Sequence, residues 1–196
     1  MPNLKELLMD EKTRLEQVSA YLAKLDHAQK CAEVLSLNKK CQARLWELAK
    51  DGKPIDLEYL VPKEIKPLEP QPFDGKNSLP IYTRFQKVFY RTPDGQIAGY
   101  NNSNAAWFAG WGYYIAEKSS RDPKELAVNY MKLPKHKPAD WPEIKSNTSG
   151  LSRLVYGNMV DFLRRVDDDV LIGKATRKGE KEMESYFVLV RHSPRK

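Results

Sequence analysis

The chain of 196 residues has little of what membrane, secreted and disulfide-linked proteins need. No run approaches the roughly 18 apolar residues of a membrane span, so we expect none. The start, MPNLKELLMDEK, has no basic segment followed by an apolar one, so we expect no secretory signal. The two cysteines, Cys31 and Cys41, fall in one predicted helix, about 15 Å apart and too distant for a disulfide. We therefore expect an intracellular, cytoplasmic protein with free thiols.

The motifs of common catalytic centres are also missing. The three histidines, His27, His136 and His192, are far apart, and no cysteine and histidine cluster has zinc-ligand spacing. The sequence has no G-x-G-x-x-G, no P-loop and no G-x-S-x-G. We therefore expect no metal and no cofactor, and neither classical nucleotide chemistry nor triad hydrolysis.

Positive charge is present but dispersed. The net charge is +7, yet lysines and arginines are interleaved with acids and form no basic block. This pattern favours a solvated surface with attraction for anionic ligands at one rim, and no specific nucleic-acid partner. Nucleic-acid binding is the alternative, and it predicts an affinity that falls steeply with salt.

Residues 1–60 are predicted to form a helical hairpin and a short helix. Apolar residues recur every three or four positions over 3–25 and again over 28–50, and the sequence Asp51-Gly52-Lys53-Pro54 ends the second helix. One further helical turn is predicted over 56–60. We expect the hairpin to pack on the main domain. The alternative is a surface for a partner or for a second copy in a homodimer.

A proline-rich connector over 61–80 is predicted to separate the helices from an all-β region over 81–196. From Ile81 the apolar period changes to two, and Thr92-Pro93-Asp94-Gly95 predicts a tight turn between two strands. The expected fold is mostly β with an α-helical N-terminal extension. It is an antiparallel, lipocalin-like β-barrel, a class that can hold one small ligand.

An aromatic and glycine-rich stretch over 105–118 is predicted to be a long strand and the main ligand-binding element. Trp107, Trp111 and Tyr113 share one face of such a strand, and Tyr114 lies on the other. One of these faces is expected to line the barrel. Gly110 and Gly112 suit a sharp bend or the close approach of a ligand. Simple filling of the core is the alternative.

The stretch 151–191 is predicted to be strand, acidic turn, strand, basic turn and strand. Over 151–166 the apolar residues also fit a helix, but Gly157-Asn158 is a hairpin signal, so we predict strand. The triplet Asp167-Asp168-Asp169 invites a metal or acid–base site. A hairpin turn is favoured, because aspartates there accept hydrogen bonds from nearby backbone N–H groups.

This closing stretch resembles a lipocalin-like family named for a G-x-W-x-G motif, whose members carry a second conserved domain of unknown function. The similarity lies in FLRRVDDDVLIGKATRKG and YFVLVR, between Phe162 and Arg191. It extends only loosely upstream to Arg44. No G-x-W-x-G follows 56–60, and Gly110 to Tyr114 lack the family's lysine. The resemblance implies a barrel and brings no activity with it.

The function expected from these patterns is the binding of a small apolar or aromatic molecule in the barrel. A cofactor-independent isomerisation, cyclisation or lyase step by proton transfer is compatible with such a pocket. A non-enzymatic carrier or protein-interaction module is the alternative. The candidate catalytic residues are Asp161, Arg165 and Tyr113, and the candidate ligand-binding residues are Arg84, Tyr100, Trp107, Trp111, Tyr114 and Lys174.

Overall fold

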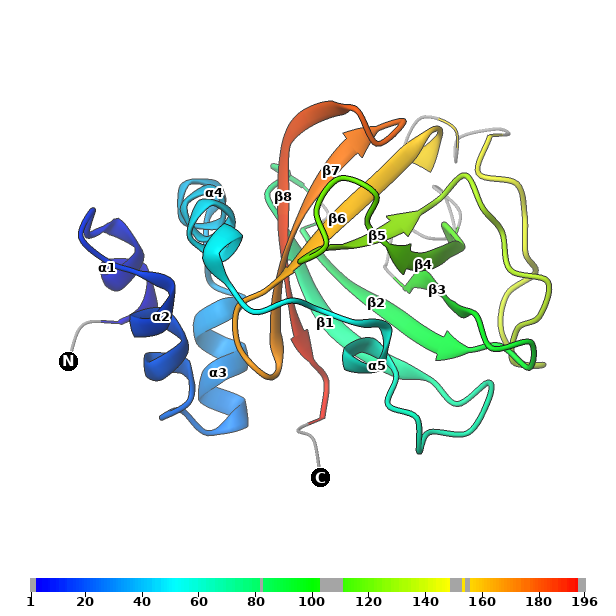
Figure 1. Cartoon of the computed structure of the whole chain (residues 1–196), viewed down its shortest axis with the longest axis horizontal. Coiled ribbons are helices and arrows are strands. Elements are labelled where there is room, and N and C mark those ends of the chain that lie inside the picture. The colour runs from blue at the N-terminus through cyan, green and yellow to red at the C-terminus, as the bar shows by residue number, and fades with distance from the viewer. Residues whose placement is uncertain (1–2, 82, 103–110, 149–152, 154–155, 194–196) are drawn as a thin grey trace.

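The computed structural model shows a closed β-barrel with four short helices against one side (Figure 1). It describes residues 3–81, 83–102, 111–148, 153 and 156–193. Eight antiparallel strands follow one another in chain order, and β1 pairs with β8 to close the barrel. Their bounds are β1 Gln71–Asn77, β2 Arg84–Arg91, β3 Ile97–Asn102, β4 Tyr114–Lys118, β5 Leu126–Asn129, β6 Met159–Arg165, β7 Val170–Arg177 and β8 Lys181–Arg191. The predicted fold class is confirmed.

The N-terminal segment forms short helices rather than the predicted pair of long ones. Their bounds are α1 Leu4–Met9, α2 Leu15–Leu22, α3 His27–Val34, α4 Lys39–Leu48, a 3-10 turn at Ala49–Asp51 and α5 Leu57–Leu60. Side-chain capping divides the long helices, because Asn38 accepts a hydrogen bond from the Cys41 N–H and starts α4 anew. Asp10 likewise accepts from the Lys12 N–H in a turn after α1. Cys31 and Cys41 therefore lie on separate helices, and both are free thiols.

Helices α3 and α4 pack against the outer face of β7 and β8, α1 packs on α3 and α4, and apolar side chains of all four helices join one buried cluster with those of the barrel wall. Leu22, Val34 and Leu45 belong to the same buried cluster as Ile172 and Val188 from the barrel wall. Figure 1 shows the helices on that side only. The apolar stripes that could have served a partner are thus largely used within the chain. In the part of the chain that is described, no helix is long and apolar enough to cross a membrane.

The predicted connector over 61–80 contains the first barrel strand. β1 begins at Gln71, and Pro72 occupies its second position. Proline is tolerated there because it lies at the beginning of the strand, where a missing N–H does least harm to the ladder. The Pro72 carbonyl still accepts from the His192 N–H. The barrel therefore starts about ten residues before the predicted boundary at 81.

The acidic triplet turns the chain between β6 and β7, as predicted. It also fixes α3 to the barrel, because the Lys30 ammonium lies 3.1 Å from an Asp167 carboxylate oxygen and 3.5 Å from one of Asp169. Arg191, on β8, is 3.5 Å from the other Asp169 oxygen. Lys30 is only 8% exposed, so this is a largely buried contact between a helix and a hairpin.

We expect Lys30→Met to lower the free energy of unfolding by roughly 3 kcal/mol, the low end for breaking a buried ion pair, because Arg191 still faces Asp169. Urea denaturation measures the change. Lys24→Met, at an exposed position just before α3, is the control and should be within about 0.5 kcal/mol of the wild type. Equal loss in both variants would contradict this role for Lys30.

Alternation along the strands separates inward from outward side chains, and the inward ones at one end of the barrel are apolar. At one end, α5 and the residues beside it pack on interior apolar side chains; this cluster includes Leu60, Phe89, Leu163, Leu171 and Leu189. Tyr59 and Arg191 help to close this end, where the Arg191 guanidinium donates to the Tyr59 carbonyl. We call the opposite end, where β2 and β6 begin and β3 and β7 end, the mouth.

Two sequence expectations near the mouth need correction. Of the predicted strand over 105–118, only Tyr114–Lys118 is strand; residues 105–110 lie outside the described part, and 111–113 have no regular structure. Gly112 has a φ of 56°, a left-handed conformation that suits the predicted bend. The predicted division of the aromatic residues holds for those that are described, because Trp111 and Tyr113 belong to one cluster and Tyr114 to another.

The strand predicted over 151–166 is confirmed only for Met159–Arg165. Arg153 and Tyr156 are helical, and the Gly157 N–H donates to the Arg153 carbonyl. Asn158, with a φ of 57°, ends this turn in the left-handed conformation that asparagine tolerates. Gly157-Asn158 is thus the exit from a helical turn and not a hairpin. The apolar spacing over 151–166 fits both periods, and at Arg153 and Tyr156 the structure is helical.

Candidate functional site

A cluster of polar side chains is buried inside the barrel, towards the mouth. Lys87 and Asp161 face each other across the interior from β2 and β6, with 1% and 3% of their surfaces exposed. Asn101 on β3 and Tyr130, directly after β5, complete the cluster. Strand alternation places these residues, because Lys87 shares its face with Phe85 and Phe89, and Asp161 shares its face with Leu163.

Lys87 uses all three of its hydrogen-bond donors within this cluster. Its ammonium donates to an Asp161 carboxylate oxygen at 3.0 Å, to the Asn101 side-chain oxygen at 3.2 Å and to the Tyr130 hydroxyl. The Tyr130 hydroxyl also accepts from the Asn101 amide at 2.8 Å and donates to Asp161 at 3.3 Å. The lysine is therefore held in one position by three partners.

Asp161 is less completely satisfied. The oxygen that accepts from Lys87 and Tyr130 is Oδ2, whereas Oδ1 is buried and has no hydrogen-bond partner among the described residues. An unpartnered carboxylate oxygen costs free energy in a folded protein, so such groups are rare outside functional positions. Asp161 Oδ1 is thus an acceptor available to a ligand or a proton donor.

Burial shifts the ionisation of both partners. Desolvation raises the pKa of Asp161, and the neighbouring Lys87 ammonium opposes this effect. Desolvation lowers the pKa of Lys87, and the Asp161 carboxylate opposes that effect. Each group is therefore closer to its neutral form than it would be in water, which makes proton transfer between the two less costly. Burial also raises the pKa of Tyr156, whose ring stacks on Tyr130, to about 12.

Aromatic rings surround the Lys87 ammonium. The Nζ atom lies 4.9 Å from the ring centroid of Tyr114, 5.0 Å from that of Tyr130 and 5.1 Å from that of Phe187. Phe85, two residues nearer the mouth on β2, is 6.0 Å away. These distances are typical of cation–π contacts, which stabilise a positive charge where few water molecules can. We call these four rings, with Lys87 at their centre, the aromatic box.

Glycines on the strands make room for the box. A Cβ atom at Gly99 would lie 2.6 Å from the Tyr114 ring, and one at Gly173 would lie 2.1 Å from the Phe187 ring. Gly75 accepts the Phe85 ring in the same way. Small residues opposite large ones let the rings reach across the interior, as close packing requires.

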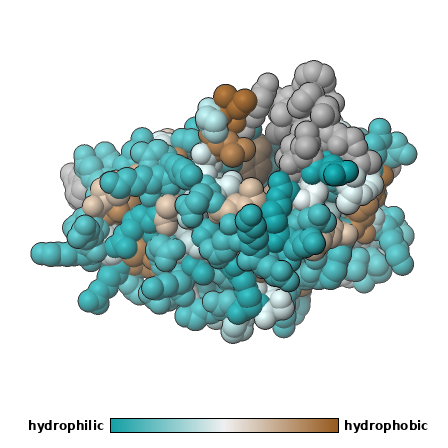
Figure 2. All heavy atoms as spheres, turned by 90° about the horizontal axis from the view of Figure 1, so that it is seen from above, coloured by the Kyte–Doolittle hydropathy of each residue, from teal (hydrophilic) through white to brown (hydrophobic). Residues whose placement is uncertain are grey.

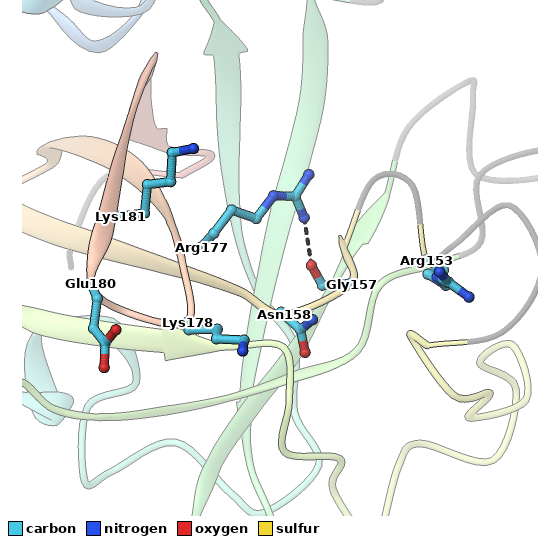
Figure 3. Close-up of a pocket in the computed structure, with 7 residues that line it drawn as sticks. All are labelled: Arg153, Gly157, Asn158, Arg177, Lys178, Glu180 and Lys181. Carbon is cyan, nitrogen blue, oxygen red and sulfur yellow. Dashed lines mark hydrogen bonds between the residues drawn. The ribbon is translucent and has the colours of Figure 1, made fainter.

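A pocket of about 530 Å³ with basic side chains lies at the mouth, beside the start of β6 and the turn between β7 and β8 (Figure 3). Arg177 pairs with Met159 on β6, two residues from Asp161, and its guanidinium donates to the Gly157 carbonyl. Two residues along a strand correspond to about 7 Å. The pocket is lined by Arg153, Gly157, Asn158, Arg177, Lys178, Glu180 and Lys181. Its positive charge favours anionic ligands near the mouth.

The structure brings two of the sequence-predicted site residues together. Asp161 is in the polar cluster, and Tyr114 is in the aromatic box. Tyr100, Trp111 and Tyr113 instead form a separate cluster with Trp141, outside the barrel wall and under the loop that follows β5. Tyr114, the first residue of β4, faces the interior, whereas Tyr113 directly before the strand points to the other side.

The remaining predicted residues lie elsewhere. Arg84 is exposed at the mouth end of β2, and Arg165 pairs with Asp168 at the opposite end of β6. Lys174 points to the outer face of β7, where its ammonium pairs with Glu182. Trp107 lies outside the described residues. Arg84, Arg165 and Lys174 do not belong to the polar cluster.

Sequence reasoning missed Lys87, Asn101 and Tyr130. One signal was available for Lys87, because it alternates with Phe85 and Phe89 in a strand and so shares their inward face. A charged residue between two inward phenylalanines is a candidate for a buried functional group. Asn101 carried no such signal, because the run Asn101-Asn102-Ser103-Asn104 is typical of a turn.

No three or more histidine, cysteine or acidic side chains come together as a possible metal site within the described ranges. Comparisons of the chain with protein-family models, with curated proteins and with solved structures found no match. The family resemblance of 162–191 therefore stays a prediction.

Proposed function

We propose that the mouth half of the barrel binds a small molecule with an apolar or aromatic body and a polar group, and that Asp161 exchanges a proton with it. The observation that carries this proposal is the buried Asp161 Oδ1, which has no partner among the described residues. The reaction class is a cofactor-independent isomerisation, cyclisation or elimination, in which the protein moves one proton.

The chain's own residues supply the parts of such a step. Asp161 in its carboxylate form accepts a proton from the ligand through Oδ1, while Oδ2 stays bound to Lys87. The Lys87 ammonium compensates the charge of the carboxylate before transfer and can return a proton afterwards. Hydrogen bonds from and to Tyr130 and Asn101 hold the Lys87 ammonium and the Asp161 carboxylate in position. The raised pKa of Asp161 favours the protonated product of this step.

The surroundings favour an aromatic or apolar ligand body. Phe85 and Phe187 pack edge to face at 6.0 Å between ring centroids and present apolar surface beside Lys87. Phe85 is only half-buried, so it lies at the transition between the mouth and the polar cluster. A ligand that displaces this ring reaches Asp161 Oδ1, the carboxylate oxygen that has no hydrogen-bond partner among the described residues.

The interaction-module alternative has less support. The apolar stripes of α1 to α4 are buried in one cluster that the helices share with the barrel wall, and Figure 2 shows a mostly hydrophilic face. The large hydrophobic side chains that are exposed among the described residues are Met9 and two pairs close in sequence, Leu79 with Ile81 and Met131 with Leu133. Exposed apolar groups as small as these are ordinary. The resemblance to the lipocalin-like family is likewise proposed here, and the closed barrel is compatible with it.

Native mass spectrometry of protein purified from its own host tests the proposal. We expect a co-purifying small molecule, and we expect Asp161→Asn to lower its occupancy about tenfold, the effect of one lost charge-assisted hydrogen bond. Glu182→Gln is the control, because it removes an acidic partner of a buried lysine on the outer face. Wild-type protein without any bound molecule, or equal occupancy in Asp161→Asn, would contradict the proposal.

A further inference from the structure

Lys87 has the surroundings of an amine nucleophile. The residue is 1% exposed, its Nζ atom is 3.0 Å from a carboxylate that can take its proton, and four aromatic rings surround it. Burial lowers its pKa, so the neutral amine is more accessible than in an exposed lysine. The same acid that removes its proton has a second oxygen, Oδ1, without a partner in the described chain.

Lys174 shows that burial alone does not give a lysine the surroundings of a nucleophile. It is 5% exposed, but it lies on the outer face, where its ammonium is paired with Glu182. Burial acts to lower its pKa, but the hydrogen bond and charge of Glu182 outweigh that effect and raise it. Lys174 is near one ring, that of Tyr186 at 5.3 Å, rather than inside a box. It therefore serves as an internal comparison for Lys87.

We propose that Lys87 binds an aldehyde or ketone covalently, as an imine, and that carbonyl compounds are the ligand class of the barrel. This inference rests on the proposed function, because it assigns the ligand to the same site. It adds a covalent step and a nucleophile to a site in which Asp161 acts on protons.

Imine formation needs no group other than Lys87, Asp161 and the carbonyl compound. The Lys87 ammonium gives one proton to Asp161, and the free amine adds to the carbonyl carbon while the C=O π bond breaks. A proton passes from the new ammonium to the alkoxide oxygen, which gives a neutral carbinolamine. Asp161, now protonated, returns its proton to the hydroxyl group, which leaves as water, and the nitrogen becomes a protonated imine. One water is released, and no oxidant or reductant is needed.

The aromatic box fits the product as well as the starting group. A protonated imine carries its positive charge at the nitrogen, in the position where the ammonium already lies 4.9–5.1 Å from three ring centroids. The rings and the Asp161 carboxylate therefore stabilise the cation before and after the reaction. An electron-withdrawing iminium next to a carboxylate also makes the neighbouring C–H acidic, which agrees with proton transfer by Asp161.

Reductive trapping tests this inference on the full-length protein. The probes are propanal and benzaldehyde, each with sodium cyanoborohydride at pH 6.5, followed by peptide mapping. We expect Lys87 to carry one propyl or one benzyl group and to be labelled at least tenfold more than Lys174. Exposed lysines are protonated at this pH and label slowly, because their pKa is about 10.4.

Two variants sharpen the result. Asp161→Asn keeps the shape of the side chain and removes the proton acceptor, so the rate of labelling at Lys87 should fall about tenfold or more. Glu182→Gln leaves labelling at Lys87 unchanged. Circular dichroism confirms that each variant is folded before it is compared. Labelling at Lys87 that is no faster than at Lys174 with both probes overturns the imine.

Failure of the imine is distinguishable from failure of the proposed function. If a co-purifying molecule is present and depends on Asp161 while Lys87 stays unlabelled, the non-covalent site stands and the covalent step is wrong. If neither is found, both are wrong. Labelling of Lys87 by one probe and not by the other supports the imine and defines the size of ligand that the aromatic box admits.

Discussion

Lys87→Met alone is expected to lower the free energy of unfolding by about 4 kcal/mol at pH 7. Without the ammonium, Asp161 is buried beside no positive charge in the described cluster, so it must be protonated in the folded state. Protonating at pH 7 a carboxyl group whose unfolded pKa is about 3.9 costs about 1.36 kcal/mol per pH unit. Urea denaturation at fixed pH measures the loss.

The sign of the pH dependence follows from the raised pKa of Asp161. A carboxyl group with a raised folded pKa destabilises the fold above its unfolded pKa and does not below it. The deficit of Lys87→Met should therefore shrink as the pH falls, to about 1 kcal/mol at pH 4.5. A deficit independent of pH would show that lost packing, rather than the uncompensated carboxyl group, causes the effect.

The double variant Lys87→Met with Asp161→Leu is the control. It removes both charged groups and keeps their volumes filled, so at pH 7 it should recover most of the stability that the single variant loses. It should also abolish ligand binding and reductive labelling at this position. A stable barrel without function would show that the pair is retained for chemistry and not for folding.

Gly173→Ala is expected to destabilise the fold by about 1–3 kcal/mol through overpacking. The three atoms nearest to the added Cβ would all belong to the Phe187 ring, the closest at 2.1 Å. Gly173 is not among the glycines with positive φ, so the ring and not the backbone conformation requires glycine. The displaced ring would also change the aromatic box around Lys87, which chemical denaturation and reductive labelling can follow together.

A second substitution separates this clash from other effects. Phe187→Leu combined with Gly173→Ala should be more stable than Gly173→Ala alone by about 1 kcal/mol, because the two positions are in contact and their effects are not additive. Gly95→Ala is the matched comparison, since its φ of 85° disfavours alanine while nothing lies within 4 Å of the new Cβ. Additive losses at Gly173 and Phe187 would contradict the packing that we describe.

Much of the fold could be predicted from the sequence. Alternating apolar residues, the turn at Thr92 to Gly95 and the acidic turn at Asp167 to Asp169 all indicate an antiparallel barrel, and the structure has it. The errors lie where local capping outweighs periodicity. Asn38 divides one predicted helix, and Asn158 ends a helical turn in a stretch whose apolar spacing also fits a strand.

The candidate site was harder to predict because it depends on pairing across the barrel. Lys87 and Asp161 are 74 residues apart in sequence and 3.0 Å apart in space. The sequence named Asp161 as a catalytic candidate together with Arg165 and Tyr113, and the alternation of Lys87 with Phe85 and Phe89 indicates an inward lysine but not its partner. The aromatic assignment was right for Tyr114, which faces the interior, whereas Trp111 and Tyr113 pack outside the barrel wall, because alternation alone does not say which face is inward.

The pairing of β1 with β8 sets the order of events when the chain folds. Phe73 is opposite Arg191, so the contact that closes the barrel joins residues more than a hundred positions apart. Contacts at such separation slow folding, because a long loop must be ordered before they form. During synthesis on a ribosome, one edge of β1 has no partner strand until β8 has been made. Helices α3 and α4 cannot pack on β8 before then either. A chaperone that shields this edge during synthesis would therefore raise the yield of folded protein.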